Sequence, residues 1–208
     1  GAFLTNVVHL YADEGTYTIS ALVSDGEPGG TSGASSALVT VFDTPPVVAS
    51  VLTNAPVAAG SAATVWMNLQ SNPLGDSFAY DFDWNGNGLF TDTGIDVLGA
   101  SSNLSFFTAS SAATVSVNVR ARDDEGNTAM GAVEVVWTDR PPVAADDVTA
   151  TDEDAAVMIT PLANDSDPDT GDALTLVSFS QPAHGALTAA GATLTYSPEA
   201  NFNGTDSF

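Results

Sequence analysis

The feature that most constrains the fold is a two-residue alternation of apolar and polar side chains. It is present in residues 17–24, 115–121 and 133–137. In the second of these segments Val115, Val117 and Val119 are separated by Ser116 and Asn118. Successive side chains of a strand point to opposite faces, so this period is typical of antiparallel strands buried on one side. Since no segment shows a sustained period of 3.6 residues, the sequence predicts an all-β protein.

The same pattern occurs twice along the chain. The segment 17–25 aligns with 115–123, and the segment 45–49, which begins Pro45-Pro46, aligns with 141–145, which begins Pro141-Pro142. The repeat distance is therefore about 100 residues, the size of one immunoglobulin-like β-sandwich. Each Pro-Pro pair fixes two φ angles, which is typical of a stiff boundary between modules.

These boundaries predict three tandem β-sandwich modules in an elongated array, cut as a window from something longer. Residues 1–45 would hold the C-terminal part of a first module, and residues 46–140 a complete second one. Residues 141–208 would hold the N-terminal part of a third module, whose last hairpin is missing. The strands expected in the middle module are 47–53, 62–70, 77–84, 95–99, 103–109, 113–122 and 129–138.

Acidic residues dominate the charge. The chain carries 26 acidic residues, no lysine and three arginines, and its net charge is -23. This charge argues against binding to nucleic acid, which needs a basic surface, and against adsorption to anionic membranes. No run of 18 apolar residues exists, so no insertion into a membrane is predicted. Two explanations of the acidity stay open: several calcium sites, or solubility in a saline medium.

Residues 81–92 form a twelve-residue pattern of oxygen donors that is typical of calcium loops. The ligand positions are occupied by Asp81, Asp83, Asn85, Asn87 (through its carbonyl) and Asp92, and Gly86 lies at the sharp turn. Calcium takes six to eight oxygen ligands, and this segment offers many. The alternative interpretation is a plain hairpin turn made by Asn-Gly-Asn-Gly.

A second group of acids is expected where the middle and third modules meet. Its members are Asp146, Asp147, Asp165, Asp167, Asp169 and Asp172, with Asp139 in the linker. In a sandwich the 81–92 loop would lie at the exit end, and the 165–172 turn at the entry end of the next module. Carboxylates packed together repel one another unless a cation neutralises them, so calcium is predicted at this junction. By the same reasoning Asp76, Asp123, Asp124 and Glu125 would approach Asp13, Glu14 and Asp43 at the first junction, with an acidic, solvated turn as the alternative at both junctions.

Several runs resemble known families. His9-Leu10-Tyr11 followed by Gly15-Thr16-Tyr17-Thr18-Ile19, and Tyr80-Asp81-Phe82-Asp83, resemble PKD domains, which are immunoglobulin-like sandwiches. The third module resembles the cadherin-like repeats of bacterial adhesins in residues 152–154, 163–169, 171–175, 182–185 and 196–208. The resemblance implies calcium-stiffened tandem arrays outside the cell or on its surface.

No catalytic group is predicted, because no motif places a nucleophile beside a base. Phe78, Tyr80, Phe82 and Trp84 share one face of a strand and are expected in the core, with a sugar-stacking platform as the alternative.

The favoured function is a non-catalytic structural or adhesive segment of a secreted or cell-surface repeat protein. Its expected partners are the neighbouring modules of the same chain, with other cell-surface proteins, glycans or copies of itself as further candidates. The alternatives are a substrate-binding accessory segment of a secreted polysaccharide- or protein-degrading enzyme, and a subunit of a surface layer or filament.

Overall fold

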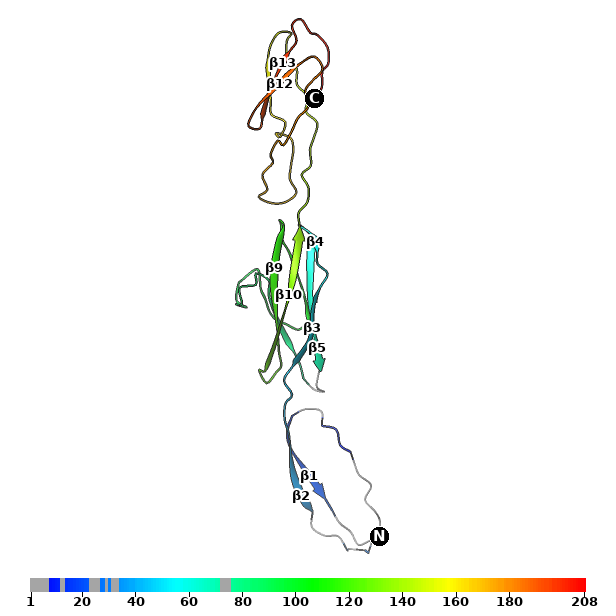
Figure 1. The fold of residues 1–208 in the computed structure, drawn as a ribbon. Coiled ribbons are helices and arrows are strands. Elements are labelled where there is room, and N and C mark those ends of the chain that lie inside the picture. Colours follow the sequence, from blue (N-terminus) through cyan, green and yellow to red (C-terminus); the bar gives the residue numbers. More distant parts are fainter. Residues whose placement is uncertain (1–7, 12–13, 23–26, 29, 31–33, 72–75) are drawn as a thin grey trace. The chain divides into compact units, whose positions relative to one another are not determined.

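A computed structural model describes residues 8–11, 14–22, 27–28, 30, 34–71 and 76–208, and the described residues contain strands and no helix (Figure 1). The strands are β1 (Gly15–Ala21), β2 (Ser35–Val41), β3 (Val47–Thr53), β4 (Val57–Ala58), β5 (Ala62–Ser71), β6 (Ala79–Asp83), β7 (Val97–Ala100), β8 (Leu104–Thr108), β9 (Ala113–Arg122), β10 (Thr128–Thr138), β11 (Val157–Ile159), β12 (Gly185–Ala190) and β13 (Thr193–Pro198). The all-β prediction is therefore confirmed. The expected residues Asp13 and 23–25 lie outside the described ranges.

The chain divides into two compact units, each made of several segments. Unit 1 consists of residues 1–54, 64–107 and 115–135, and unit 2 of residues 55–63, 108–114 and 136–208. No helix in the described ranges has the length and hydrophobicity needed to cross a membrane.

The first strands form an antiparallel hairpin, β1–β2, in which Tyr17 lies opposite Val39 and Ile19 opposite Ala37. Because side chains alternate across a strand, these four residues share one face of the hairpin. The hydroxyl groups of Thr16, Thr18 and Ser20 lie on the other face.

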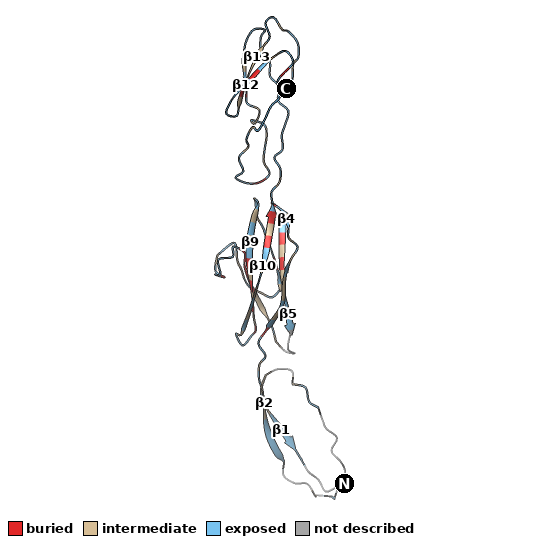
Figure 2. Ribbon diagram, in the orientation of Figure 1, coloured by how far each residue is buried: buried red, intermediate tan, exposed pale blue. Residues whose placement is uncertain are grey.

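The middle of the chain is a sandwich of two sheets. One sheet has the order β4-β10-β9-β6-β7, and the other has the order β3-β5-β8. The alternating residues of these strands meet between the sheets: Val65 and Met67 of β5, and Val117 and Val119 of β9, are fully buried. Along β10 exposed positions alternate with half-buried ones, and toward its end the buried Val135 and Trp137 lie on either side of a half-buried position (Figure 2). The period-two pattern thus specifies the core as expected.

All seven strands expected in the middle module are present: 47–53 and 113–122 have the expected bounds, and the other five differ by one or two residues at their ends. The structure adds β4, which pairs in parallel with the end of β10, where Trp137 lies opposite Val57. β4 has two residues, too few to produce an alternating pattern, so the sequence could not reveal it. It lets the segment after β3 pass from one sheet to the other.

The last part of the chain contains a three-stranded sheet of order β11-β13-β12. Its small core consists of Ile159, Leu187 and Leu194, with Leu176 and Tyr196 packed against it. Gly185 lies against the ring of Tyr196, and a side chain there would collide with the ring.

Candidate metal sites

The predicted calcium loop begins at Asp83, the last residue of β6. Its carboxylate is fully buried. Oδ1 accepts the backbone N–H of Gly86 at 2.7 Å, and Oδ2 accepts the N–H of Gly88 at 2.8 Å and Nδ2 of Asn118 at 2.7 Å. Gly86 and Gly88 have φ angles of 69° and 82°, which glycine adopts more readily than other residues. Asp83 thus fixes the turn through its own hydrogen bonds.

The remaining donors of the loop converge on Asp92. Its Oδ2 atom accepts Nδ2 of Asn85 and Nδ2 of Asn87, both at 2.6 Å. The side-chain oxygens of the two asparagines accept backbone N–H groups, from Asn87 at 3.1 Å and from Leu89 at 2.7 Å. The structure therefore brings Asn85, Asn87 and Asp92 together.

Asp96 is a member of this loop that the sequence reasoning missed. Its carboxylate accepts the backbone N–H of Trp84 at 3.2 Å and that of Asp92 at 2.9 Å, so it joins the two ends of the loop. The available signal was its place four residues after Asp92, just past the turn at Gly94.

Asp81 lies in a different environment from the rest of the predicted ligand set. Its side chain is fully buried, and Oδ1 accepts the N–H of Gly99 at 2.8 Å and Nη2 of Arg122 at 3.0 Å. Oδ2 accepts Nε of Arg120 at 2.8 Å and Nε of Arg122 at 3.0 Å. Burial opposes the charged form, but the hydrogen bonds from Arg122, Gly99 and Arg120 outweigh it and lower the pKa of Asp81. Both oxygens are thus occupied by protein donors.

The strand pairing explains this arginine clamp, in which Arg120 and Arg122 both bind the Asp81 carboxylate. Asp81 on β6 lies directly opposite Arg120 on β9 in the antiparallel register. The guanidinium of Arg120 lies 4.4 Å from the ring centre of Phe90, a loop residue that is itself buried. The segment after β6 therefore packs against the guanidinium of Arg120. The other expectation for this strand is confirmed in part, because Phe82 and Trp84 are buried in the core and cannot form a sugar platform.

Carboxylates gather in threes at two other places among the described residues. One group, in unit 2, is Asp139, Asp169 and Asp172, with oxygen atoms within 4.8 Å of one another. Asp169 is only 2% exposed. Its carboxylate accepts Nε of Arg140 at 2.5 Å and the backbone N–H of Arg140 at 3.1 Å. Arg140 also donates to the carbonyl of Pro168, so it fastens the 168–169 turn to the residues that follow β10.

The charges of this group perturb one another. Burial raises the pKa of Asp139, and the neighbouring Asp169, Asp172 and Asp167 raise it further. Burial also acts against the charged form of Asp169, but the Arg140 side chain and backbone N–H prevail, and the net pKa is lowered. The Arg140 contacts thus favour the charged form of Asp169, while burial and the neighbouring carboxylates disfavour that of Asp139.

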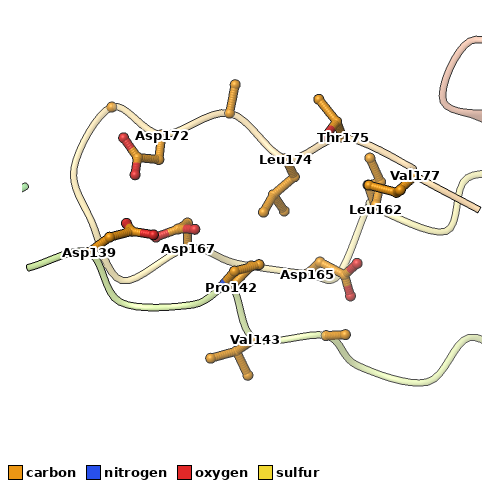
Figure 3. A pocket seen from close by; sticks show the side chains of 13 residues that line it. Asp139, Pro142, Val143, Leu162, Asp165, Asp167, Asp172, Leu174, Thr175 and Val177 are labelled. Atoms are coloured by element: carbon orange, nitrogen blue, oxygen red, sulfur yellow. The ribbon is translucent and has the colours of Figure 1, made fainter. Parts of the chain in front are cut away.

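The other predicted junction acids are less concentrated. Asp165 and Asp167 line a groove of about 560 Å³ together with Asp139 and Asp172 (Figure 3). In that view Asp139, Asp167 and Asp172 lie near one end, and Asp165 stands apart beyond Pro142 and Leu174.

The carboxylates of Asp165 and Asp167 each accept a backbone N–H, from Ala145 and from Asp169, both at 2.8 Å. Asp146 and Asp147 are exposed and do not line the groove. The 81–92 loop belongs to unit 1, and residues 165–172 belong to unit 2, so a calcium site shared by the two segments stays a prediction.

The second group of three, in unit 1, is Glu14, Asp43 and Glu125. Oδ1 of Asp43 is buried and accepts no hydrogen bond from any described residue, and Oδ2 accepts Nδ2 of Asn127. Burial and the carboxylates of Glu14 and Asp124 raise the pKa of Glu125 to about 7. Asp123, also expected here, instead accepts the backbone N–H and Nδ2 of Asn127.

Comparison with known proteins agrees with this architecture. Residues 139–208 match the family model of a bacterial Ig domain, so this part of the chain is an immunoglobulin-like repeat. Such domains are generally non-catalytic and typically extracellular or on the cell surface. A segment of 67 residues, 32% of the chain, is 43% identical to Protein GAMETE EXPRESSED 2 of Arabidopsis thaliana. The chain spans about 7% of the length of that protein.

Proposed function

We propose that the chain is a non-catalytic structural or adhesive segment of a large extracellular repeat protein, stiffened by calcium. The match of residues 139–208 to a bacterial Ig domain supports the repeat architecture. The PKD-like and cadherin-like runs of the sequence support tandem modules. Its immediate partners are then the neighbouring modules of the same chain.

One observation supports the proposed role of calcium. Carboxylates are held close together at two places in a chain that has 26 acidic side chains and only three arginines. Like charges at such distances raise the free energy of the folded state unless a cation lies among them. Carboxylates and carbonyl oxygens are the ligands that calcium prefers. The Asp139, Asp169 and Asp172 group is the stronger candidate for stiffening, because Arg140 binds only one of its three carboxylates.

The loop after β6 is proposed as a further calcium site with a revised ligand set. Asp83, Asn85, Asn87 and Asp92 remain, and Asp96 is added because it bridges the loop ends. Asp81 is left out, since the guanidinium groups of Arg120 and Arg122 already neutralise its charge, whereas the donors to Asp83 are uncharged N–H groups. In the revised register the loop begins at Asp83, and Gly88 takes the sixth position.

Calorimetric titration of the full chain with calcium tests the proposal. We expect dissociation constants of about 10⁻⁴–10⁻³ M, the range of extracellular modules. Asp172→Asn and Asp92→Asn should each remove or weaken one class of site. Glu134→Gln, an exposed acid of β10 outside these groups, is the matched control for the loss of one charge.

The outcome distinguishes specific sites from general acidity. If all three variants weaken calcium binding equally, the acids act only as a diffuse negative surface, and the proposal of calcium sites fails. If calcium does not bind at all at millimolar concentration, the acidity serves solubility alone. A calcium-dependent rise in the unfolding temperature of wild type that Asp172→Asn loses would support stiffening at that group.

A further inference from the structure

The outer face of the sheet β3-β5-β8 differs from the rest of the chain because it carries no charge. The sequences of these strands, VVASVLT, AATVWMNLQS and LSFFT, contain no acidic or basic residue. The whole chain has 29 charged side chains. A neutral sheet of this size in a chain of net charge -23 is therefore a distinct surface.

Alternation places large apolar side chains on this outer face. Ser105 is buried and accepts Nε1 of Trp84 at 3.0 Å, so its neighbours Leu104 and Phe106 point outward. They are 46% and 69% exposed. On β5, Val65 and Met67 are fully buried, which turns Trp66 outward. Leu52, 43% exposed, lies opposite Trp66 on β3.

Two uncharged polar side chains, Asn68 and Ser50, lie on the same face as these apolar side chains. Asn68 lies opposite Ser50 in the register, and its Nδ2 donates to Oγ of Ser50 at 3.1 Å. Asn68 is two residues from Trp66, so it projects from the same face. The face thus combines aromatic rings, leucines, an amide and a hydroxyl group, all within unit 1.

We propose that this face, made of Ser50, Leu52, Trp66, Asn68, Leu104 and Phe106, binds a neutral polysaccharide of β-1,4-linked pyranose rings. Such a chain offers flat C–H surfaces that pack on aromatic rings, and hydroxyl groups that bond to amides and hydroxyls. A cationic partner would be drawn to the acidic loops instead, and an anionic one would be repelled. A second copy of the chain would bring its own negative charge. The proposal is independent of calcium.

Binding of the full chain to cellohexaose and to chitohexaose, followed by NMR titration, tests it. We expect weak, saturable binding of at least one hexasaccharide that persists in chelator. Phe106→Ala should lower the association constant roughly threefold to tenfold, the range of one aromatic contact. Phe42→Ala is the matched control, because Phe42 is 83% exposed but lies outside this sheet.

Three results would overturn the proposal. The first is no binding of either hexasaccharide by a folded wild-type chain, whether or not that chain binds calcium. The second is equal weakening by Phe106→Ala and Phe42→Ala, which would mean that any exposed aromatic contributes. The third is a concentration-dependent self-association that Phe106→Ala abolishes, which would make the face a contact between copies of the chain. The thermal melt of Phe106→Ala must match that of wild type, and Leu104→Ser provides a second variant if it does not.

Discussion

Replacing Asp81 with asparagine should destabilise the middle sandwich strongly and leave calcium binding intact. The carboxylate is fully buried and accepts bonds from Arg120, Arg122 and the N–H of Gly99. Asparagine has nearly the same shape, but one oxygen becomes an NH₂ group. Whichever way the amide is turned, a donor then faces donors.

The expected magnitude follows from these contacts. Breaking a buried ion pair costs about 3–5 kcal/mol. The side chains of Arg120 and Arg122 are 31% and 40% exposed, so water can hydrate them once the carboxylate charge is gone. We therefore place the loss below that range, at about 2–3 kcal/mol. For a sandwich of this size the melting temperature should fall by about 10–20 °C.

Thermal unfolding followed by tryptophan fluorescence measures this loss, because Trp84 and Trp137 are buried in the core. Glu134→Gln, which removes an exposed charge from the same sandwich, should melt within a few degrees of wild type. Calcium titration of the same variants completes the test. If Asp81→Asn melts like wild type and weakens calcium binding as Asp92→Asn does, then Asp81 is a metal ligand and the reasoning from the arginine clamp is wrong.

Three further predictions concern packing, the acidic groups and pH. Gly131→Ala should lower the free energy of unfolding, measured by urea denaturation, by about 1–3 kcal/mol, because the added Cβ would lie 2.5 Å from Cγ2 of Val51. Val51→Ala should recover part of that loss in the double variant. Additive effects of the two substitutions would contradict the contact. Arg140→Gln should speed amide exchange in residues 168–172 and make that exchange more sensitive to calcium, since Asp169 loses its guanidinium; unchanged exchange would show that the turn is held by other contacts. Burial opposes the charge of Asp206, but bonds from the N–H groups of His184 and Ser207 lower its pKa from 3.8. Its contribution to stability is therefore present above that value and lost as pH falls through the lower, folded-state value, so Asp206→Asn should flatten the acid limb of the stability profile; an unaltered limb would contradict this.

The alternating pattern was enough to predict the strands and their buried faces, because it is a local signal. Val117 and Val119, or Val65 and Met67, can be assigned to a core from their immediate neighbours. The turn at Asp83 was also visible locally, because Gly86 and Gly88 lie within five residues of the carboxylate that binds their N–H groups.

The role of Asp81 depends on a contact that is distant in the sequence. Arg120 is 39 residues away and Arg122 is 41 residues away. Had the register of β6 and β9 been deduced, Asp81 would have stood directly opposite Arg120, and a cross-strand ion pair would have been the natural interpretation. Without the register, the spacing of oxygens in residues 81–92 favoured a metal ligand.

The three arginines of this chain all form ion pairs with buried aspartates. Arg120 and Arg122 share one buried aspartate, and Arg140 binds another. Every arginine of the protein is therefore used to neutralise a carboxylate that the fold removes from water, where an unpaired charge is most costly. The other acids of the chain include Asp139, Asp172 and Glu125, and the chain has no lysine and no fourth arginine. Their mutual repulsion must be relieved by protons, as the raised pKa of Glu125 indicates, or by cations from the medium. Above the raised pKa of Glu125 protons no longer relieve this repulsion, so the divalent cation concentration should then have a larger effect on the stability of these groups than on that of the arginine-neutralised Asp81.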